Sequence, residues 1–376
     1  MRYELIGDKI LYLLLPLPWV ITAIFLKRIS LQLMTILWII TTFTMIYLAP
    51  IGSRDFGNYL RDYYEIGSGS IGAYVIQDPL YVFLAWISNL VFSSASVFYF
   101  TLASLALWLK MFAFRRLCAA HTLPLALYMC SYFFLHEFTQ IRAALSIGIF
   151  LIALTILPYN LIKFLTLSLL ASLIHVQALL GLMCVGIVFI LRTPFRLKIF
   201  SISALFFMAL SILHPFDQMV QMLFGMFPDQ RAATYILLSG DAELRPNQFS
   251  FISILACMTA YWGLVGSSFG VKSAPGTPLF RQPQICIFIG LLLGGVSLSL
   301  FGSLPIIAFR ISEHFFAVLP IALWIVVNDQ GKFPLPRQIL WFLCPIFLYI
   351  FLVHSPYLLE VPYNEILPSI DWIAPL

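Results

Sequence analysis

Three basic side chains lie inside apolar stretches of this sequence, where charged residues are rare. Arg142 belongs to HEFTQIRAALSIGIFLIAL, His175 to LLASLIHVQALLG and Arg310 to PIIAFRISEHFF. An arginine stays protonated in proteins, and a charge at membrane depth costs several kcal/mol unless it is paired or faces water. Buried cations spread over an apolar chain therefore indicate a membrane enzyme or transporter that acts on an anionic substrate.

Arg142 has polar neighbours near the start of its predicted helix. Glu137 lies about one turn before it, and Gln140 lies closer still. One interpretation is structural, an Arg142–Glu137 ion pair that closes the helix ends. The other is that the guanidinium binds phosphate, whose geometry its planar fork matches. His175 is predicted at the same depth, so it can reach one pocket with Arg142, although a lone histidine is more often simply hydrogen-bonded in the core.

Two further groups of polar residues have two interpretations each. Arg310, Glu313 and His314 are spaced i, i+3 and i+4, which places them on one helix face. They form either a self-satisfied polar stripe or a second cation for the same anion, oriented by the acid. The segment SRDFGNYLRDYYEIG mixes tyrosines with charges and is followed by Asp78. Such loops are usually just solvated, but tyrosines among carboxylates also stack on and hydrogen-bond to sugars.

The composition assigns the chain to the membrane proteins. Of 376 residues 61% are hydrophobic and 10% are charged, whereas soluble domains carry about 25% charged residues. The mean hydropathy is +0.98. The six cysteines form no C-x-x-C pair, which favours a core role over a zinc or disulfide framework. The net charge of +5 is spread along the chain, so we expect no nucleic-acid partner.

The motifs that bind nucleotides or catalytic metals are absent from the sequence. There is no G-x-x-x-x-G-K-[ST], no D-x-D and no H-E-x-x-H. A phosphate or diphosphate must then be bound by side chains, chiefly arginine. We therefore expect no metal and no cofactor.

Apolar runs predict an all-α, polytopic integral membrane protein with about twelve transmembrane helices. The runs cover about 10–26, 31–50, 96–114, 122–138, 140–157, 161–177, 178–191, 197–214, 249–269, 283–302, 305–327 and 338–356. A thirteenth run, 79–93, is too short to cross and is predicted to be a re-entrant or interfacial segment. We expect 161–191 to form a helical hairpin, and residues 1–376 to form a single transmembrane domain.

The distribution of charges predicts the orientation in the membrane. One set of connections holds thirteen cations and a single acid, Asp329. These cations are Lys27, Arg28, Lys110, Arg115, Arg116, Lys163, Arg192, Arg196, Lys198, Lys272, Arg281, Lys332 and Arg337. The positive-inside rule makes this set cytoplasmic. Both termini and the two larger loops, 51–78 and 214–248, are then predicted to lie outside.

Several segments together resemble a known family. FTQIRAALSIGIFLIAL, a short basic turn and SLLASLIHVQALL closely resemble the central signature of the EpsG family of Wzy-type polysaccharide polymerases. RDFGNYLRDYY resembles the family's first outer loop, DPLYVFLAWIS the segment after it, and AFRISEHFF its late arginine helix. The resemblance spans about 40–365. The chain departs from it at Asp78, where the family often has glutamate, and over 214–248, which matches no part of the pattern.

The resemblance implies a glycosyltransferase that needs neither metal nor nucleotide. It would join undecaprenyl-diphosphate-linked oligosaccharide repeat units into O-antigen or exopolysaccharide at the periplasmic face of a bacterial inner membrane. Arg142, His175 and Arg310 would stabilise the leaving diphosphate, and a carboxylate, Asp55 or Glu313, would accept the proton of the attacking hydroxyl. The candidate substrate-binding residues are Arg54, Tyr59, Arg61, Asp62, Asp78, Glu137, Gln140 and His314. Besides the lipid-linked substrate and membrane lipid, a polysaccharide co-polymerase that regulates chain length is a candidate partner.

Three alternatives stay open at the level of sequence. An O-antigen ligase uses the same donor, but generally has one larger outer loop where this chain has two of moderate size. Another polyprenyl-linked glycosyltransferase would have acidic residues after the first crossing, where this chain has Lys27 and Arg28. A transporter of lipid-linked oligosaccharides would carry cations along the whole crossing path, whereas here the candidates gather near the outer boundary.

Overall fold

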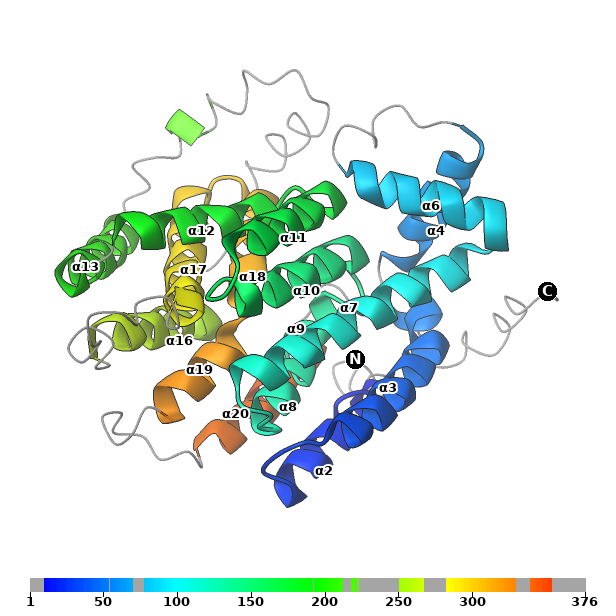
Figure 1. Ribbon diagram of the computed structural model, residues 1–376, viewed down its shortest axis with the longest axis horizontal. Coiled ribbons are helices and arrows are strands. Elements are labelled where there is room, and N and C mark those ends of the chain that lie inside the picture. The colour runs from blue at the N-terminus through cyan, green and yellow to red at the C-terminus, as the bar shows by residue number, and fades with distance from the viewer. Residues whose placement is uncertain are drawn as a thin grey trace, which may run out of the picture. The chain divides into compact units, whose positions relative to one another are not determined.

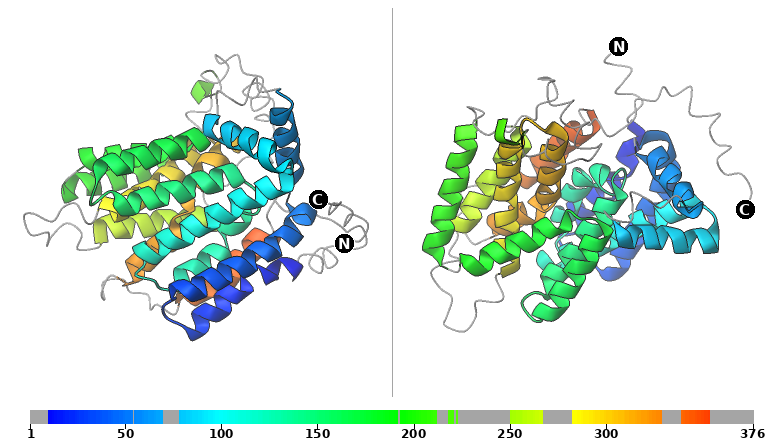
Figure 2. Two further views of the ribbon diagram at one scale, coloured as in Figure 1. Left: turned by 45° about the vertical axis from the view of Figure 1, so that its right-hand side comes forward. Right: turned by 90° about the horizontal axis from the view of Figure 1, so that it is seen from above.

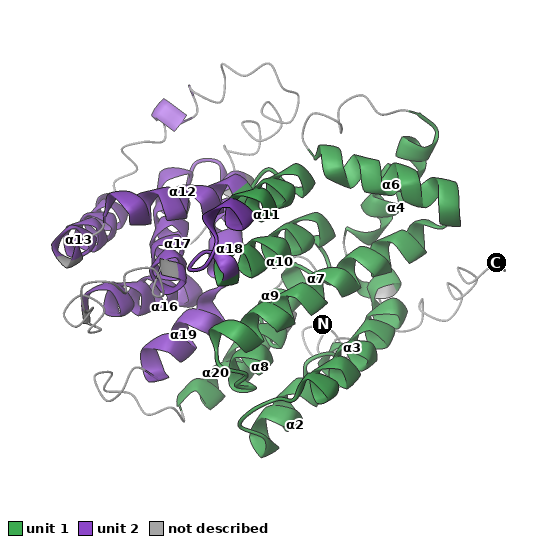
Figure 3. Ribbon diagram, viewed as in Figure 1, with its two compact units in different colours: residues 1–155, 165–178, 337–376 green, residues 156–164, 179–336 purple. Residues whose placement is uncertain are grey.

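The computed structural model describes residues 10–53, 55–69, 78–191, 193–211, 218–220, 222, 250–266, 282–328 and 339–353. Within these ranges the regular elements are helices, and the one pairing of extended backbone is an isolated bridge between Arg28 and His121 (Figure 1). Arg54 and most of the predicted outer loop 214–248 lie outside the described residues. The chain divides into two compact units (Figure 3), which we call unit 1 and unit 2.

Unit 1 comprises residues 1–155, 165–178 and 337–376. Its helices are η1 (Ile10–Leu14), α2 (Leu17–Phe25), α3 (Leu31–Gly52), α4 (Phe56–Gly67), α6 (Pro79–Phe92), α7 (Ala95–Leu117), α8 (Leu123–Met129), α9 (Tyr132–Leu135), α10 (Ile141–Ile156), α11 (Leu161–Ile174), α20 (Ile339–Leu348) and the π-helical η7 (Tyr349–Val353). The long helices start at serine caps: the hydroxyl of Ser30 accepts from the N–H of Leu33, and that of Ser94 from the N–H of Val97.

The two long helices of unit 1 form the frame on which the shorter ones pack. Helix α3 lies beside α7, as the views of Figures 1 and 2 show. Helix α4 is amphipathic, and its buried residues recur at helical spacing. They are Phe56, Tyr59, Asp62, Tyr63 and Ile66. This face packs α4 against α6 and α7.

The predicted span 122–138 is not one helix, and this prediction was wrong. The chain forms α8 and α9 instead, with a break at Cys130 and Ser131. The whole stretch 122–139 is buried. A broken helix at membrane depth is tolerated where protein surrounds it, because the freed backbone groups then find partners. The Ser131 hydroxyl, for example, donates to the carbonyl of Leu127 at 2.7 Å. The predicted span 10–26 is also interrupted, at Leu15 and Pro16.

Unit 2 comprises residues 156–164 and 179–336. Its helices are α12 (Ala178–Ile190), α13 (Pro194–Leu210), α16 (Phe251–Tyr261), the π-helical η4 (Trp262–Gly266), α17 (Gln282–Leu300), α18 (Pro305–Phe316) and α19 (Leu319–Asn328). Helix α17 is central, since α13, α16, α18 and α19 all pack against it. Gly294 permits the contact with α18, because a Cβ there would lie 2.6 Å from the ring of Phe316.

Four helical stretches are long and apolar enough to cross a membrane: Leu31–Pro50, Ala95–Leu117, Pro283–Leu300 and Ile307–Asn328. They coincide with four of the predicted spans. The predicted short segment 79–93 is the 14-residue helix α6, which at 1.5 Å per residue is about 21 Å long, shorter than a hydrocarbon core of about 30 Å. The predicted hairpin 161–191 consists of two helices, α11 and α12, which are separated by His175–Gln177.

Candidate functional site

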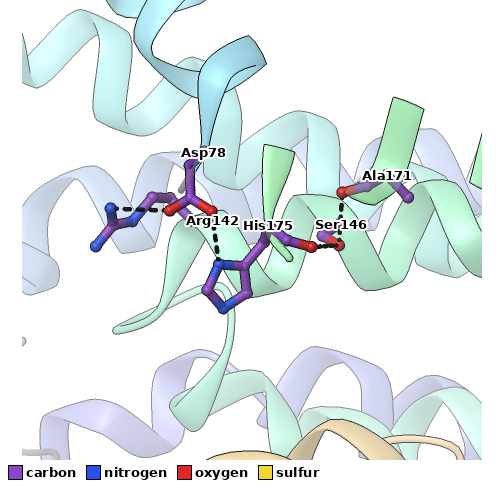
Figure 4. A network of polar contacts seen from close by, with 5 residues as sticks. All are labelled: Asp78, Arg142, Ser146, Ala171 and His175. Atoms are coloured by element: carbon purple, nitrogen blue, oxygen red, sulfur yellow. Dashed lines mark hydrogen bonds and ion pairs between the residues drawn. The ribbon is translucent and has the colours of Figure 1, made fainter. Parts of the chain in front are cut away.

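The carboxylate of Asp78 joins two of the predicted site residues in unit 1. Its Oδ2 lies 3.1 Å from a guanidinium nitrogen of Arg142, and its Oδ1 lies 3.2 Å from Nδ1 of His175 (Figure 4). The backbone N–H of Val176 also donates to this carboxylate. Three donors from two helices therefore converge on one acid, and we call Asp78, Arg142 and His175 the aspartate cluster.

Local sequence explains how each member is positioned. Asp78 precedes Pro79, which occupies the first turn of α6 and favours a helix start there. Arg142 is the second residue of α10. His175 follows the last residue of α11, and its backbone N–H still donates to the carbonyl of Ala171 at 3.0 Å. All three side chains therefore sit at helix ends, where the chain meets the predicted membrane boundary.

Ser146 fixes the end of α11 against α10. Its hydroxyl lies one turn beyond Arg142 and bonds to the carbonyl of Ala171 at 3.0 Å, with a longer contact to that of His175 at 3.5 Å (Figure 4). The sequence analysis did not single this serine out. The available signal was its spacing, since i and i+4 lie on the same face of a helix.

Two tyrosine rings flank the Arg142 guanidinium. Its central carbon lies 5.4 Å from the ring centre of Tyr59 on α4 and 5.2 Å from that of Tyr81 on α6. Both are cation–π distances, and the guanidinium also donates to the Tyr59 hydroxyl. The Tyr81 hydroxyl is buried without a hydrogen-bond partner among the described residues. Together the rings restrict the orientation of the arginine fork.

Burial and charge differ across the aspartate cluster. The Asp78 side chain is 6% exposed, whereas those of Arg142 and His175 are 24% and 20% exposed. Burial alone would raise the pKa of Asp78, but the hydrogen bond and charge of His175, with the charge of Arg142, outweigh it and hold this pKa below its usual value. Burial raises the pKa of Tyr59 more than Arg142 lowers it. The aspartate cluster thus presents a buried carboxylate and two partly exposed donors, and the neutral phenol of Tyr59 lies beside it.

Glu137 does not pair with Arg142, so the structural interpretation of that pair was wrong. Its Oε1 lies 2.7 Å from Nζ of Lys110, and its Oε2 accepts from the Tyr128 hydroxyl at 2.6 Å. The chain is not helical between Glu137 and Gln140, so the two residues are not one helical turn apart. We call Lys110, Tyr128 and Glu137 the lysine cluster.

The remaining candidates of the first outer loop lie on or beside α4. Asp55 precedes this helix and accepts from the side chain of Asn58 at 3.5 Å. Asp62 is buried on the inner face of α4, whereas Arg61 faces outward and contacts Glu65 at 3.9 Å. Helix α4 therefore turns Tyr59 towards Arg142 and turns Arg61 away from it.

Four further candidates lie on or beside helices α10 and α18. Gln140 immediately precedes α10, and its carbonyl accepts from the N–H of Ala144. Arg310, Glu313 and His314 all lie on α18 in unit 2, where Arg310 is exposed and His314 is buried. The predicted convergence of Arg310 with Arg142 stays a prediction.

No metal centre is evident in the part of the chain that the structure describes. In that part no three His, Cys, Asp or Glu side chains gather as ligands. The arrangement is chemically suited to another task, the binding of an anionic group by partly exposed donors that a buried carboxylate orients.

Comparison with known proteins identifies the family. No curated protein and no solved structure matches this chain. Residues 31–368 match the EpsG family, and this range contains both clusters and every site residue predicted from the sequence. The match covers nearly the whole sequence, and the chain belongs to the EpsG family.

Proposed function

We propose that this protein joins undecaprenyl-diphosphate-linked oligosaccharide repeat units into O-antigen or exopolysaccharide at the periplasmic face of a bacterial inner membrane. Membership of the EpsG family indicates a polysaccharide-polymerase-type function, and together with the apolar helices it makes this a membrane protein. The observation that carries the finer proposal is the Arg142 guanidinium, bonded on one side to Asp78 and flanked by two tyrosine rings.

The proposed reaction requires a cation where the leaving group departs. A hydroxyl of the acceptor repeat attacks the anomeric carbon of the lipid-linked donor, and the bond to the diphosphate breaks. Negative charge then grows on the diphosphate oxygens, and preorganised donors stabilise such charge most effectively where water is scarce. Arg142 suits this role, because Asp78 engages one of its terminal nitrogens and the side chain stays partly exposed.

The proposed topology places this chemistry at the outer membrane boundary. It has twelve crossings, and segment 79–93 (helix α6) enters and leaves on one side. Asp78 ends the loop 51–78, which the charge distribution places outside. The lipid tail of an undecaprenyl diphosphate stays in the membrane while its head group reaches the boundary, which is where Arg142 would meet it.

We propose further roles for Arg310, for the two larger outer loops and for a partner protein. Arg310 supplies a second cation for the diphosphate, and the two larger outer loops bind the sugars. A chain-length-regulating co-polymerase would act beside the membrane domain. None of these roles calls on a metal or a nucleotide, since the diphosphate ester itself carries the driving force.

The decisive experiment uses the purified full-length protein in detergent with authentic lipid-linked repeat units. Chelator is added, and nucleotide sugar is left out. We expect the glycan to lengthen into a ladder of repeats on a gel. A transporter of lipid-linked sugars would leave single repeats, because detergent micelles have no second compartment, and that result would refute the proposal.

The control for this assay is an exposed arginine to which no role in the reaction is assigned. Arg196 is exposed at the start of α13 and donates to the carbonyl of Ile190 at 3.2 Å. The variant Arg196→Lys should give the wild-type ladder. It controls for a general effect of changing arginine to lysine.

The orientation has its own test, which does not depend on activity. Ser68 is exposed just after α4. In a variant without the native cysteines, Ser68→Cys should react with an impermeant maleimide in intact spheroplasts, and Lys27→Cys should not. The reverse labelling pattern would overturn the proposed topology.

A further inference from the structure

The two ring nitrogens of His175 have different surroundings. Nδ1 faces the Asp78 carboxylate at 3.2 Å (Figure 4). Nε2, on the far side of the ring, has no hydrogen-bond partner among the residues that the structure describes. A carboxylate accepts hydrogen bonds, so the neutral imidazole carries its proton on Nδ1 and keeps the lone pair on Nε2. The His175 side chain is 20% exposed, and no described residue occupies the hydrogen-bonding position of Nε2.

The backbone around His175 is held by several hydrogen bonds. The His175 backbone N–H donates to Ala171, and its carbonyl accepts from the N–H of Ala178, both at 3.0 Å. Ser146 bonds to the same end of α11. The backbone N–H of Val176 donates to Asp78, so the same carboxylate binds both this N–H and the ring of His175. A base must be positioned before its strength matters, and this histidine is positioned.

We propose that His175 is the general base of the transfer reaction, acting through Nε2, and that Asp78 is the positioning residue that sets its tautomer. The inference rests on the proposed polymerase function and deepens it. It assigns to the imidazole the proton transfer that the sequence analysis gave to a carboxylate, Asp55 or Glu313.

The step balances in atoms and charge. The acceptor hydroxyl oxygen forms a bond to the anomeric carbon, and the bond from that carbon to the diphosphate oxygen breaks. The electron pair of the broken bond leaves with the diphosphate, next to Arg142. The hydroxyl proton moves to Nε2, which makes His175 an imidazolium. Asp78 then faces a full positive charge and stabilises it, and the proton passes to water before the next cycle.

Asp78 itself is poorly placed to be the base. Three donors already occupy its oxygens, from Arg142, His175 and Val176. The positive charge of Arg142, 3.1 Å from Oδ2, also disfavours protonation of this carboxylate. Among the described residues, the Asp78 carboxylate joins His175 to the Arg142 guanidinium on α10, and the phenols of Tyr59 on α4 and Tyr81 on α6 flank that guanidinium.

The first test is the pH dependence of the wild-type elongation rate in detergent. A base must be neutral to act, so the rate should rise with pH and then level off. If His175 instead binds the diphosphate as a cation, the rate should fall as pH rises. A falling limb would overturn the base assignment.

The second test uses variants of the two residues. His175→Ala should lower kcat by about 100-fold or more, and added imidazole should restore part of the rate, in proportion to its neutral form. Asp78→Asn should lower kcat by about 10- to 100-fold without raising KM, because removal of a competing negative charge does not weaken diphosphate binding. His121→Gln, at the bridge to Arg28, serves as the histidine control and should behave like the wild type.

The outcomes separate the two levels of the proposal. Activity of His175→Lys within twofold of the wild type, or no imidazole rescue of a monodisperse His175→Ala protein, would overturn the base assignment while the polymerase stands. A wild-type protein that makes no polymer at any pH would overturn the proposed function, and the base assignment with it.

Discussion

Unit 1 contains two clusters of charged residues that look alike in composition and differ in access. The lysine cluster is closed, with the Lys110 and Glu137 side chains 1% and 0% exposed. The aspartate cluster is partly open, since Arg142 and His175 both reach the surface. Each cluster joins an acid to a base from another part of the chain.

The difference in access indicates a difference in task. In the lysine cluster the ammonium, the phenol and the carboxylate contact one another at 2.6 to 2.7 Å, and all three side chains are buried. The lysine cluster connects α7, α8 and the segment that leads into α10. It thereby stabilises the packing around α8 and α9. In the aspartate cluster the buried Asp78 carboxylate contacts Arg142 and His175, and both side chains stay partly exposed. Fully buried ion pairs stabilise the fold, whereas partly exposed charged groups with unused hydrogen-bonding positions can bind a substrate.

The largest expected effect is a loss of stability in a variant that disrupts the lysine cluster. Lys110→Met leaves Glu137 buried without its counter-charge, which costs about 3–5 kcal/mol. The thermal unfolding midpoint in detergent should fall sharply. In Lys110→Met/Glu137→Gln neither buried charge remains, so most of the stability should return. An elongation rate per folded molecule that collapses in this stable double variant would contradict a purely structural role.

The next largest effect is a loss of activity when the guanidinium is removed from the aspartate cluster. Arg142→Lys keeps the charge but loses the bidentate geometry and the stacking between Tyr59 and Tyr81. The elongation rate should fall about 100- to 1,000-fold, while the unfolding midpoint changes little because the side chain is partly exposed. A normal ladder of repeats from this variant would remove Arg142 from the mechanism.

A smaller effect concerns the link between α10 and α11. Ser146→Ala removes hydrogen bonds that cross between the two helices, each worth about 1 kcal/mol. The rate should fall several-fold, because His175 is then held less firmly. The matched control is Ser172→Ala: Ser172 is also buried, but its hydroxyl bonds to Ser168 within its own helix. If the two variants lose equal activity, Ser146 has no special positioning role.

The smallest effect tests the tyrosines around Arg142. Tyr59→Phe removes the hydroxyl that accepts from the guanidinium and keeps the ring. The activation free energy should therefore rise by about 1 kcal/mol or less, and the rate should fall accordingly. Tyr59→Leu also removes the cation–π contact and should be slower still. Steady-state kinetics of both variants checks this order. Equal rates in the two variants would mean that the ring face contributes nothing.

Some of the fold could be predicted because the underlying signals are local. Apolar runs predicted helices, and four of the predicted spans coincide with long apolar helices of the structure. The run 122–138 could not be resolved in this way. A segment buried on all sides is apolar all round, so its pattern looks the same whether it is one helix or the two short helices α8 and α9.

Part of the site could be predicted as well. Arg142 and His175 were grouped because both are basic residues at the same end of apolar helices, and the structure brings both to Asp78. Tyr81 and Ser146 were missed. A tyrosine or a serine in an apolar helix is ordinary. The i, i+4 spacing put Ser146 on the helix face of Arg142, but it could not tell which residue of another helix the hydroxyl would meet.

The sequence by itself determined the class of this protein: an apolar, all-helical chain with a few cations that must be paired or put to use. Which acid each cation takes was decided by the tertiary structure. Glu137 is near Arg142 in sequence and pairs with Lys110, whereas Arg142 and His175 pair with Asp78, 64 and 97 residues away. The physical reason is that ion pairs form between atoms within about 4 Å, and beyond one helical turn that proximity is set by how helices pack.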